Sequence, residues 1–440
     1  MVFIVLPAEL NYFLLIKLKY KNIKTMTIRH LFLAFALLFV AFSFAFSQEG
    51  EKEKKFGITF GGFVKNDVFY ETRQTVNARE GHFSLYPLNV KNDVVGNDIN
   101  ATPTFNMLAI QTRLTGKITG PDAFGAKTSG TIEGEFFGTG NDNVSGFRIR
   151  HAFVKLTWDK AELLSGQFWH PMFVAQSFPE VLNFNTGVPF TPFSRNPQMR
   201  FTYKIGSLNL IATAYTLRDF PTTGPSNPAT IQRNPGMPNA NFTFTITPPD
   251  SKNIFGVGID YKTVRPEIET ALGYKTNTTI SGISATAFAK GVFGDLTCKL
   301  QGYYAQNAFD IMGIGGYAVL LNSVDATTGR REYTNLNTGS AWLEVYYTKG
   351  SFVGGVFNGY TMNLGSNDRM DLDAMFARGG NIEYIYRVAP RVAFTQGKTT
   401  IGFELEYTTV AYGTSDNMCK FTNSKEVSNI RGMMSFIYKF

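Results

Sequence analysis

Apolar and polar residues alternate one by one along most of the chain beyond residue 56. In the stretch QMRFTYKI (198–205) every second residue is apolar, and the residues between them are polar or charged. The same period of two recurs to the last residue, and no helical period of 3.6 persists. Because successive side chains of a strand point to opposite faces, this pattern predicts β-strands that are apolar on one face and polar on the other.

The pattern predicts sixteen strands, separated by connections of two kinds. The strands are expected at residues 57–72, 105–119, 127–138, 147–158, 161–171, 198–206, 207–219, 253–263, 266–275, 283–291, 294–306, 340–349, 351–361, 379–389, 399–412 and 427–440. The long connections are 73–104, 172–197, 220–252, 307–339, 362–378 and 413–426. Most of the others are short, with exceptions near 139–146, 276–282 and 390–398.

Long and short connections in alternation are typical of an antiparallel barrel that crosses a membrane, with short periplasmic turns and long outer loops. The strands of a soluble sandwich also alternate in hydrophobicity, so the lengths of the connections, rather than the alternation, distinguish a membrane barrel from a sandwich. In hydrocarbon, a sheet satisfies all its backbone groups only by closing on itself. We therefore expect one all-β domain, a transmembrane antiparallel β-barrel of about 16 strands, over residues 56–440.

The two ends of the chain carry signals for export. Residues 26–47 combine a basic start, an apolar block at 31–46 and the small residues Ala45 and Ser47, which is the pattern of a secretory signal peptide. Residues 1–25 lie upstream of it and are interpreted as an early start in the gene model, and 48–55 as a short extension.

The last strand alternates and stops at Phe440. It resembles the C-terminal signature of outer-membrane barrels, which the barrel-assembly machinery reads. The expected location is the outer membrane of a Gram-negative bacterium, with lipid around the barrel.

Composition narrows the function. Charged residues make up only 17% of the chain and aromatic residues 15%, which suits a lipid-facing wall with aromatic girdles. Without residues 1–47, the net charge of +8 falls to +4, too weak and dispersed for a nucleic-acid surface. Cys298 and Cys419 have no metal-ligand spacing. We expect no cofactor, no metal and no catalytic residues.

Two segments carry a resemblance to a known family. Residues 62–74 (GFVKNDVFYETRQ) and 166–173 (GQFWHPMF) resemble segments of DcaP-like outer-membrane porins. The resemblance covers mainly the first 150 mature residues and the C-terminal strand. It implies trimers of sixteen-stranded barrels that pass small hydrophilic solutes, with a leaning toward anionic ones. The chain departs from that type at its N-terminus, where residues 49–55 leave no room for a leading coiled coil.

Charged residues on the polar faces of the strands are expected to line a water-filled lumen. Turned toward the bilayer midplane, each would cost about 2–4 kcal/mol. The predicted pore-lining residues are Lys65, Asp67, Glu71, Arg73, Arg113, Lys117, Glu133, Glu135, Glu383, Arg387, Glu404 and Glu406.

The connection 172–197 is rich in Pro and Phe, which reduce the entropy lost on ordering and supply apolar surface. We expect it to fold into the pore, with Glu180 and Arg195, and Arg200 and Lys204 on the adjoining strand, forming a constriction. Opposite charges there would orient dipolar solutes. The alternative is a loop that stays on the surface.

The leading hypothesis is a porin for passive diffusion of small polar, possibly anionic, solutes, working as a homotrimer. Two alternatives remain open. The first is an adhesin or binding protein whose barrel displays loops such as 72–104 and 308–340. The second is an outer-membrane hydrolase that would use His151 or His170.

Overall fold

The computed structural model describes residues 56–440. The predicted upstream segment, signal peptide and short extension, residues 1–25, 26–47 and 48–55, lie outside the described residues. Residues 120–126 connect two strands of the barrel and are closed by backbone hydrogen bonds between Ala123 and Ala126.

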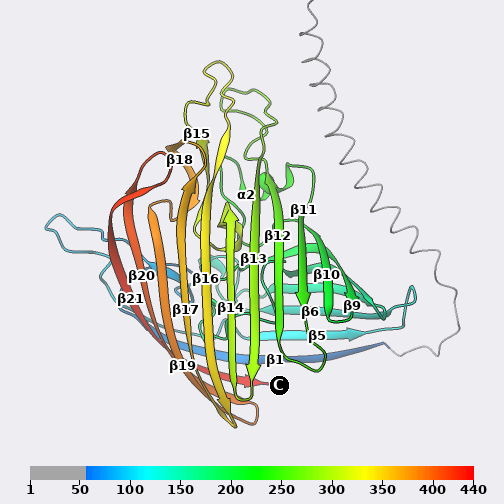
Figure 1. Ribbon diagram of the computed structural model, residues 1–440. Coiled ribbons are helices and arrows are strands. Elements are labelled where there is room, and N and C mark those ends of the chain that lie inside the picture. The colour runs from blue at the N-terminus through cyan, green and yellow to red at the C-terminus, as the bar shows by residue number, and fades with distance from the viewer. Residues whose placement is uncertain (1–55) are drawn as a thin grey trace, which may run out of the picture. The chain divides into compact units, whose positions relative to one another are not determined.

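The other residues form one antiparallel barrel (Figure 1). It has sixteen strands when β4 and β5, which follow one another at one position, are counted as one. In chain order the barrel strands are β1 (Gly57–Glu71), β4 (Thr104–Leu108) continued by β5 (Arg113–Thr119), β6 (Lys127–Glu135), β7 (Arg148–Thr157), β8 (Ala161–Trp169), β9 (Arg195–Ile205), β10 (Leu208–Tyr215), β11 (Asn239–Ile246), β12 (Ile254–Val264), β13 (Ile280–Phe293), β14 (Leu296–Gln306), β16 (Tyr333–Lys349), β17 (Phe352–Ser366), β19 (Ile382–Gln396), β20 (Thr399–Ser415) and β21 (Phe421–Lys439). β1 pairs with β21 on one side and with β4 and β5 on the other, which closes the sheet.

The other elements belong to the loops. β2 (Thr75–Ala78) and β3 (Phe83–Pro87) form a separate hairpin, and β15 (Gly315–Leu320) pairs with β16 and with β18 (Met370–Arg378). Short helices are η1 (Asn141–Asn143), α2 (Pro228–Arg233) and η2 (Ala308–Ile311). Among residues 56–440, no helix combines the length and apolar character needed to cross a bilayer.

The alternating pattern becomes the two faces of the wall. On β12, Val257 and Ile259 are 54% and 52% exposed, whereas the next inward residues, Asp260 and Lys262, are 4% and 6% exposed. The apolar residues therefore face outward and the polar residues inward, which is the arrangement of a barrel in lipid. The predicted fold class is confirmed.

Two errors in the predicted strands cancel in the count. Residues 266–275 are not a barrel strand: they lie in the connection between β12 and β13, with only an isolated bridge between Glu269 and Lys275. β11 was missed, because residues 239–246 were assigned to the long connection 220–252. With both corrected, 247–253 is a turn and 265–279 an outer loop. The strand β19 also continues to Gln396, so the predicted 390–398 turn shrinks to two residues.

The strands differ in length around the barrel. β16, β17, β19, β20 and β21 have 15 to 19 residues, whereas β6 to β11 have 8 to 11. A strand of about 9–11 residues already crosses the hydrocarbon, so the long strands project beyond it.

Candidate functional site: the channel interior

The inner face of the barrel carries charged side chains that are removed from solvent. On β1, Lys65 and Asp67 are buried, whereas Val64 and Tyr70 on the other face are about half exposed. Buried charged residues also occupy the inner faces of the other strands: Glu71, Glu135, Arg150, Lys299, Glu344, Arg387, Arg391, Glu404, Glu406 and Arg431. Each such charge needs a partner, because an unpaired buried charge is costly.

Some of these partners come from the connection between β8 and β9, which runs through the barrel interior. We call residues 170–194 the inner loop. Glu404 accepts the backbone N–H groups of Leu182 (2.6 Å) and Asn183 (3.2 Å). Glu344 accepts the N–H of Glu180 at 3.0 Å. The loop backbone has few strand partners, so carboxylates on the far wall satisfy its donors.

Cations of the wall satisfy the carbonyl groups of the same loop. Lys65 donates to the carbonyl of Leu182 at 2.7 Å, and Arg387 donates to that of Val188 at 2.8 Å. Lys65, Arg387 and Glu404 were predicted to line the pore, and in the structure they hold the inner loop. Glu406 also holds the inner loop, but as an acceptor: the side-chain amide of Asn183 donates to it at 3.1 Å.

Aromatic side chains fill the space between the inner loop and the wall. Phe184 and Phe193 of the loop belong to a buried cluster with Phe83, Phe137 and other residues of the wall and loops. The rings of Phe137 and Phe184 stack with centroids 3.9 Å apart. The Phe residues that the sequence singled out thus give the loop an apolar core inside the barrel.

The β2–β3 hairpin also folds inward. His82 in its turn contacts Asp67 of β1 at 2.7 Å, and Ser84 donates to Glu71 at 2.8 Å. Its ring Phe83 packs edge-on against Phe184 of the inner loop, with centroids 5.4 Å apart. Two segments far apart in sequence therefore meet in the lumen.

A cluster of arginine and acidic residues lies on the wall formed by β5 to β9. Glu135 accepts hydrogen bonds from Arg148 (2.8 Å) and Arg150 (2.7 Å), and Arg113 lies 3.4 Å away. Glu133 accepts from Arg150 at 2.8 Å.

Arg195, the first residue of β9, completes this cluster. It pairs with Asp219 at 2.9 Å and lies 3.6 Å from Glu135. Four arginines therefore share three carboxylates, which leaves the cluster positive. Arg150 and Arg195 also lie over the ring of Trp169, at 5.6 and 5.2 Å from its centroid.

The four residues predicted for the constriction lie in different settings. Glu180 pairs with Lys299 of β14 at 2.5 Å and keeps 45% of its side chain exposed, whereas Arg195 is buried beside Asp219. Arg200 donates to the carbonyl of Trp169 at 3.0 Å. Lys204 is exposed near the end of β9. Glu180 and Arg195 are thus held at separate places in the barrel, each by its own counterion, Lys299 and Asp219.

The ionisation of Glu180 follows from these contacts. Burial alone would raise the pKa of this carboxyl, but Lys299, with a hydrogen bond from Tyr346 and the charge of Arg391, lowers the pKa below its ordinary value. Glu180 is therefore a carboxylate at neutral pH. It is the partly exposed acidic group of the inner loop.

Three residues predicted to line the pore have other positions. Arg73 lies beyond the end of β1 and pairs with Asp98 of the following loop at 2.6 Å. Glu383 is the extra residue at a register shift between Ile382 and Tyr384 in β19, which breaks the alternation that grouped it with Arg387. Lys117 lies near the end of β5 and is exposed.

Several functional residues were missed by the sequence reasoning. Arg148, Arg150, Lys299 and Glu344 lie on polar faces of strands that were correctly predicted, whereas Arg391 lies in the part of β19 that was predicted as the 390–398 turn. Alternation places the first four inward, but no sequence signal distinguishes a charged residue of the barrel wall that binds a loop from one that faces water.

The candidate residues for enzymatic chemistry are buried. His170 lies 3.0 Å from the hydroxyl of Tyr215, which donates to Asp260 at 2.7 Å. These three residues are at most 4% exposed. Within residues 56–440, no group of three or more His, Cys, Asp or Glu side chains is placed to hold a metal ion.

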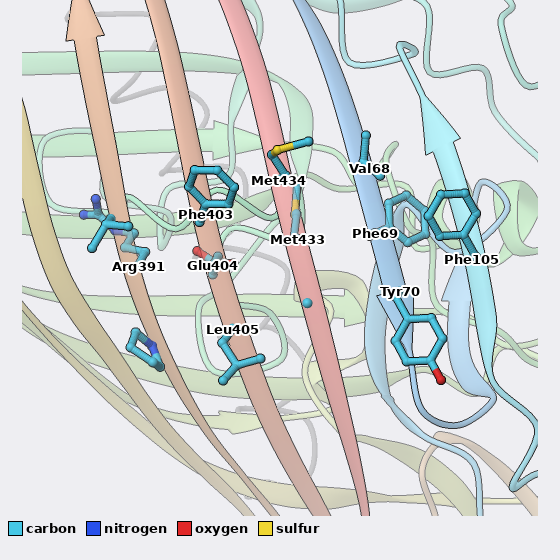
Figure 2. Close-up of a pocket in the computed structure, with 13 residues that line it drawn as sticks. Val68, Phe69, Tyr70, Phe105, Arg391, Phe403, Glu404, Leu405, Met433 and Met434 are labelled. Carbon is cyan, nitrogen blue, oxygen red and sulfur yellow. The ribbon is translucent and has the colours of Figure 1, made fainter.

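On the outer face of the barrel, an apolar groove of about 570 Å³ crosses β19, β20, β21, β1 and β4 (Figure 2). We call it the wall groove. Gly432 lies at its centre, and a Cβ added there would meet no atom within 4 Å. Its outward-facing lining residues include Val68, Tyr70, Phe105, Phe403, Leu405 and Met434.

An antiparallel barrel of sixteen strands with a loop held inside after the fifth strand has the fold of outer-membrane porins. Neither a protein-family model nor a curated protein matches the chain. Solved structures do match.

The outer membrane channel DcaP of Acinetobacter baumannii has 16% identity and a TM-score of 0.64, over 89% of this chain and 100% of that one. An anion-selective porin from Comamonas acidovorans has 13% identity and a TM-score of 0.50, over 88% and 100%. OmpT of Vibrio cholerae, in a trimer form, has 11% identity and a TM-score of 0.51, over 88% and 100%. The likeness confirms the fold expected from the resemblance to DcaP-like porins.

Proposed function

We propose that the chain is an outer-membrane porin through which small hydrophilic solutes diffuse passively, with a preference for anions, and that it works as a homotrimer. The observation that carries the proposal is the inner loop, fixed inside a barrel whose inner face is polar. A loop held this way narrows a lumen without a moving part or a cofactor. The described neighbours that are named as channels or porins support the same class.

The preference for anions rests on the arginine cluster. Four guanidinium groups share three carboxylates, so this wall has a positive potential, and charges lining a pore set its selectivity. The Comamonas neighbour is described as anion-selective, which agrees with the proposal. We further propose a transverse field between the carboxylate of Glu180 on the inner loop and the arginine cluster that contains Arg195.

The alternatives are less well supported. The 72–104 loop expected of an adhesin places its hairpin inside the barrel, through His82 and Ser84. A hydrolase would need an accessible histidine, and His170 and His151 are 1% and 7% exposed. We propose that the chain is not an enzyme. We also propose that Phe440, whose N–H donates to Gly62 at 3.2 Å next to the barrel seam, is read by the assembly machinery.

Single-channel recording in planar bilayers tests the function. The wild type should give discrete conductance steps and a reversal potential shifted toward anions. Arg113→Gln with Arg148→Gln should move the reversal potential toward cations, more at 0.1 M salt, where the Debye length is about 10 Å, than at 1 M, where it is about 3 Å. Lys349→Gln, at the exposed end of β16, is the matched control. A barrel that folds but gives no steps would contradict a porin.

A further inference from the structure

The β2–β3 hairpin carries a buried histidine in the turn that enters the lumen. His82 is 0% exposed, and its ring centroid lies 5.4 to 6.2 Å from those of three aromatic rings, Phe69, Phe137 and Phe184. Phe184 belongs to the inner loop and also contacts Phe83 of the hairpin. The position of the hairpin therefore affects the packing of the loop that narrows the lumen.

Only one of the two ring nitrogens of His82 has a partner. Nε2 lies 2.7 Å from Oδ2 of Asp67. Because an ionised carboxylate only accepts hydrogen bonds, Nε2 carries the hydrogen and donates the bond. Within residues 56–440, Nδ1 has no hydrogen-bond partner. The surroundings therefore suit the neutral imidazole, whereas the imidazolium has a second N–H that would be buried without an acceptor.

The carboxylates nearest to His82 already bind other groups. Asp67 accepts a hydrogen bond from Ser435 at 2.5 Å and pairs with Lys65 at 3.3 Å. Glu71 pairs with Arg431 at 3.1 Å. The other charged side chains on the hairpin and on the strands packed against it are Arg79 in its turn, Arg387 on β19, and Glu404 and Glu406 on β20. A proton on Nδ1 would therefore meet the cations Lys65 and Arg431 without a carboxylate of its own.

The docked hairpin thus favours the neutral ring. Burial lowers the pKa of His82 below its ordinary value; the hydrogen bond with Asp67 opposes this effect, and the charges of Lys65 and Arg431 add to it. A histidine released into water titrates near pH 6.5. Docking is therefore fully favoured above about pH 6.5. Below that pH its equilibrium constant falls by up to about tenfold per pH unit, until the docked ring itself takes up a proton.

We propose that the β2–β3 hairpin is a gate of the lumen that acid releases, with His82 as its proton sensor. Release separates His82 and Phe83 from the inner loop and leaves the hairpin free to move within the lumen. This inference rests on the channel of the proposed function, and it adds a condition under which that channel changes state.

Hydrogen exchange of the full barrel in lipid nanodiscs measures the release directly. After correction for the intrinsic effect of pH on exchange, the protection of residues 75–87 should fall between pH 6.5 and pH 5, by up to about tenfold per pH unit. The strand β13 is the internal reference and should keep constant protection. His82→Gln retains a donor for Asp67 but takes up no proton, so its hairpin protection should not depend on pH over this range.

Two other buried histidines provide matched controls. His151 and His170 lie outside the hairpin, so His151→Gln and His170→Gln should keep the wild-type pH dependence. An NMR titration of the wild-type His82 ring makes the test independent of any variant, and this ring should titrate below pH 6.5. A ring that titrates at pH 6.5 or above would overturn the inference, as would a His82→Gln hairpin that responds to acid like the wild type.

Single-channel recording connects the release to the lumen. Interruptions of the open current should become more frequent from pH 6.5 to pH 5 in the wild type and in His170→Gln, and should stay constant in His82→Gln. Hairpin release without any change in current would contradict the gate. The absence of conductance steps at every pH would instead contradict the porin, while a pH-dependent protection of residues 75–87 would still support His82 as the sensor.

Discussion

Glu404 on β20 accepts the backbone N–H of Leu182 at 2.6 Å, inside the barrel. The two residues are 222 positions apart in the chain. A carboxylate that faces the lumen therefore serves as the attachment point of the inner loop. The same holds for Glu344 and the N–H of Glu180. The position of the inner loop depends on these anchors, and the predictions below follow from that dependence.

Removing the carboxylate anchors should loosen the inner loop. Glu404→Ala with Glu344→Ala removes acceptors for three backbone N–H groups, and each hydrogen bond to a charged group is worth about 1.5–3 kcal/mol. We expect greater current noise and a larger mean conductance in planar bilayers, because the loop no longer stays in one position. Glu269→Ala, at an exposed loop position, should leave both unchanged. Identical noise in the double variant would mean that other contacts hold the loop.

The aromatic core should set the width of the lumen. Phe184 is 3% exposed and contacts rings of the hairpin and of Phe137. Phe184→Ala should destabilise this packing by about 3–5 kcal/mol, the usual cost for a buried Phe. Liposome swelling with sugars of increasing size should then show a higher size limit. Phe293→Ala, at a lipid-facing position 65% exposed, should keep the wild-type limit.

A glycine on the wall makes room for the inner loop. A Cβ added to Gly359 would lie 2.4 Å from the ring of Phe190, so Gly359→Ala forces Phe190 away. Overpacking of this kind typically costs about 1–3 kcal/mol. We expect an altered single-channel conductance, because the inner loop shifts with Phe190. Gly302→Ala, on the outward face, provides the comparison, and equal conductance in both variants would argue against the contact.

Residues 88–101, the outer part of the loop between β1 and β4, should lose their order in acid. The hydrogen bond from Arg73, followed by that from the N–H of Lys91, holds the pKa of Asp98 below its ordinary range. A carboxyl with a lowered native pKa contributes stability above its unfolded pKa, about 3.9, and loses it as the pH falls through the native pKa. Hydrogen exchange of residues 88–101 should therefore show constant protection above about pH 4 and declining protection below it. Asp98→Asn should lack this pH dependence and be less protected at neutral pH.

Alternation in the sequence predicted the wall of the barrel well, because lipid outside and polar groups inside impose a strict period of two. It failed where a segment alternates without a pairing partner. Ile268, Leu272 and Tyr274 fit the pattern, yet they are exposed residues of an outer loop. The strand β11 was overlooked because it follows a Pro- and Asn-rich stretch, although Phe242 and Phe244 alternate with Thr243 and Thr245.

The inner loop was also predicted, but its contacts were not. Lys65 and Leu182 are 117 positions apart, and Arg387 and Leu85 are 302 apart. Pairings of this kind depend on how the barrel closes and leave no local trace. The sequence therefore identified the loop and the charged face of the strands. It predicted that several charged residues would line the open pore, whereas they bind the inner loop.

The distance in sequence between the inner loop and its anchors has a consequence for biogenesis. Glu344, Arg387 and Glu404 follow the last residue of the inner loop by 150 positions or more, so these three anchors are absent until the last third of the polypeptide is in place. The contacts that the loop makes with Lys65 and with Phe83 of the β2–β3 hairpin involve earlier parts of the chain. Complete fixation of the loop, and with it the final width of the lumen, is thus a late event in maturation.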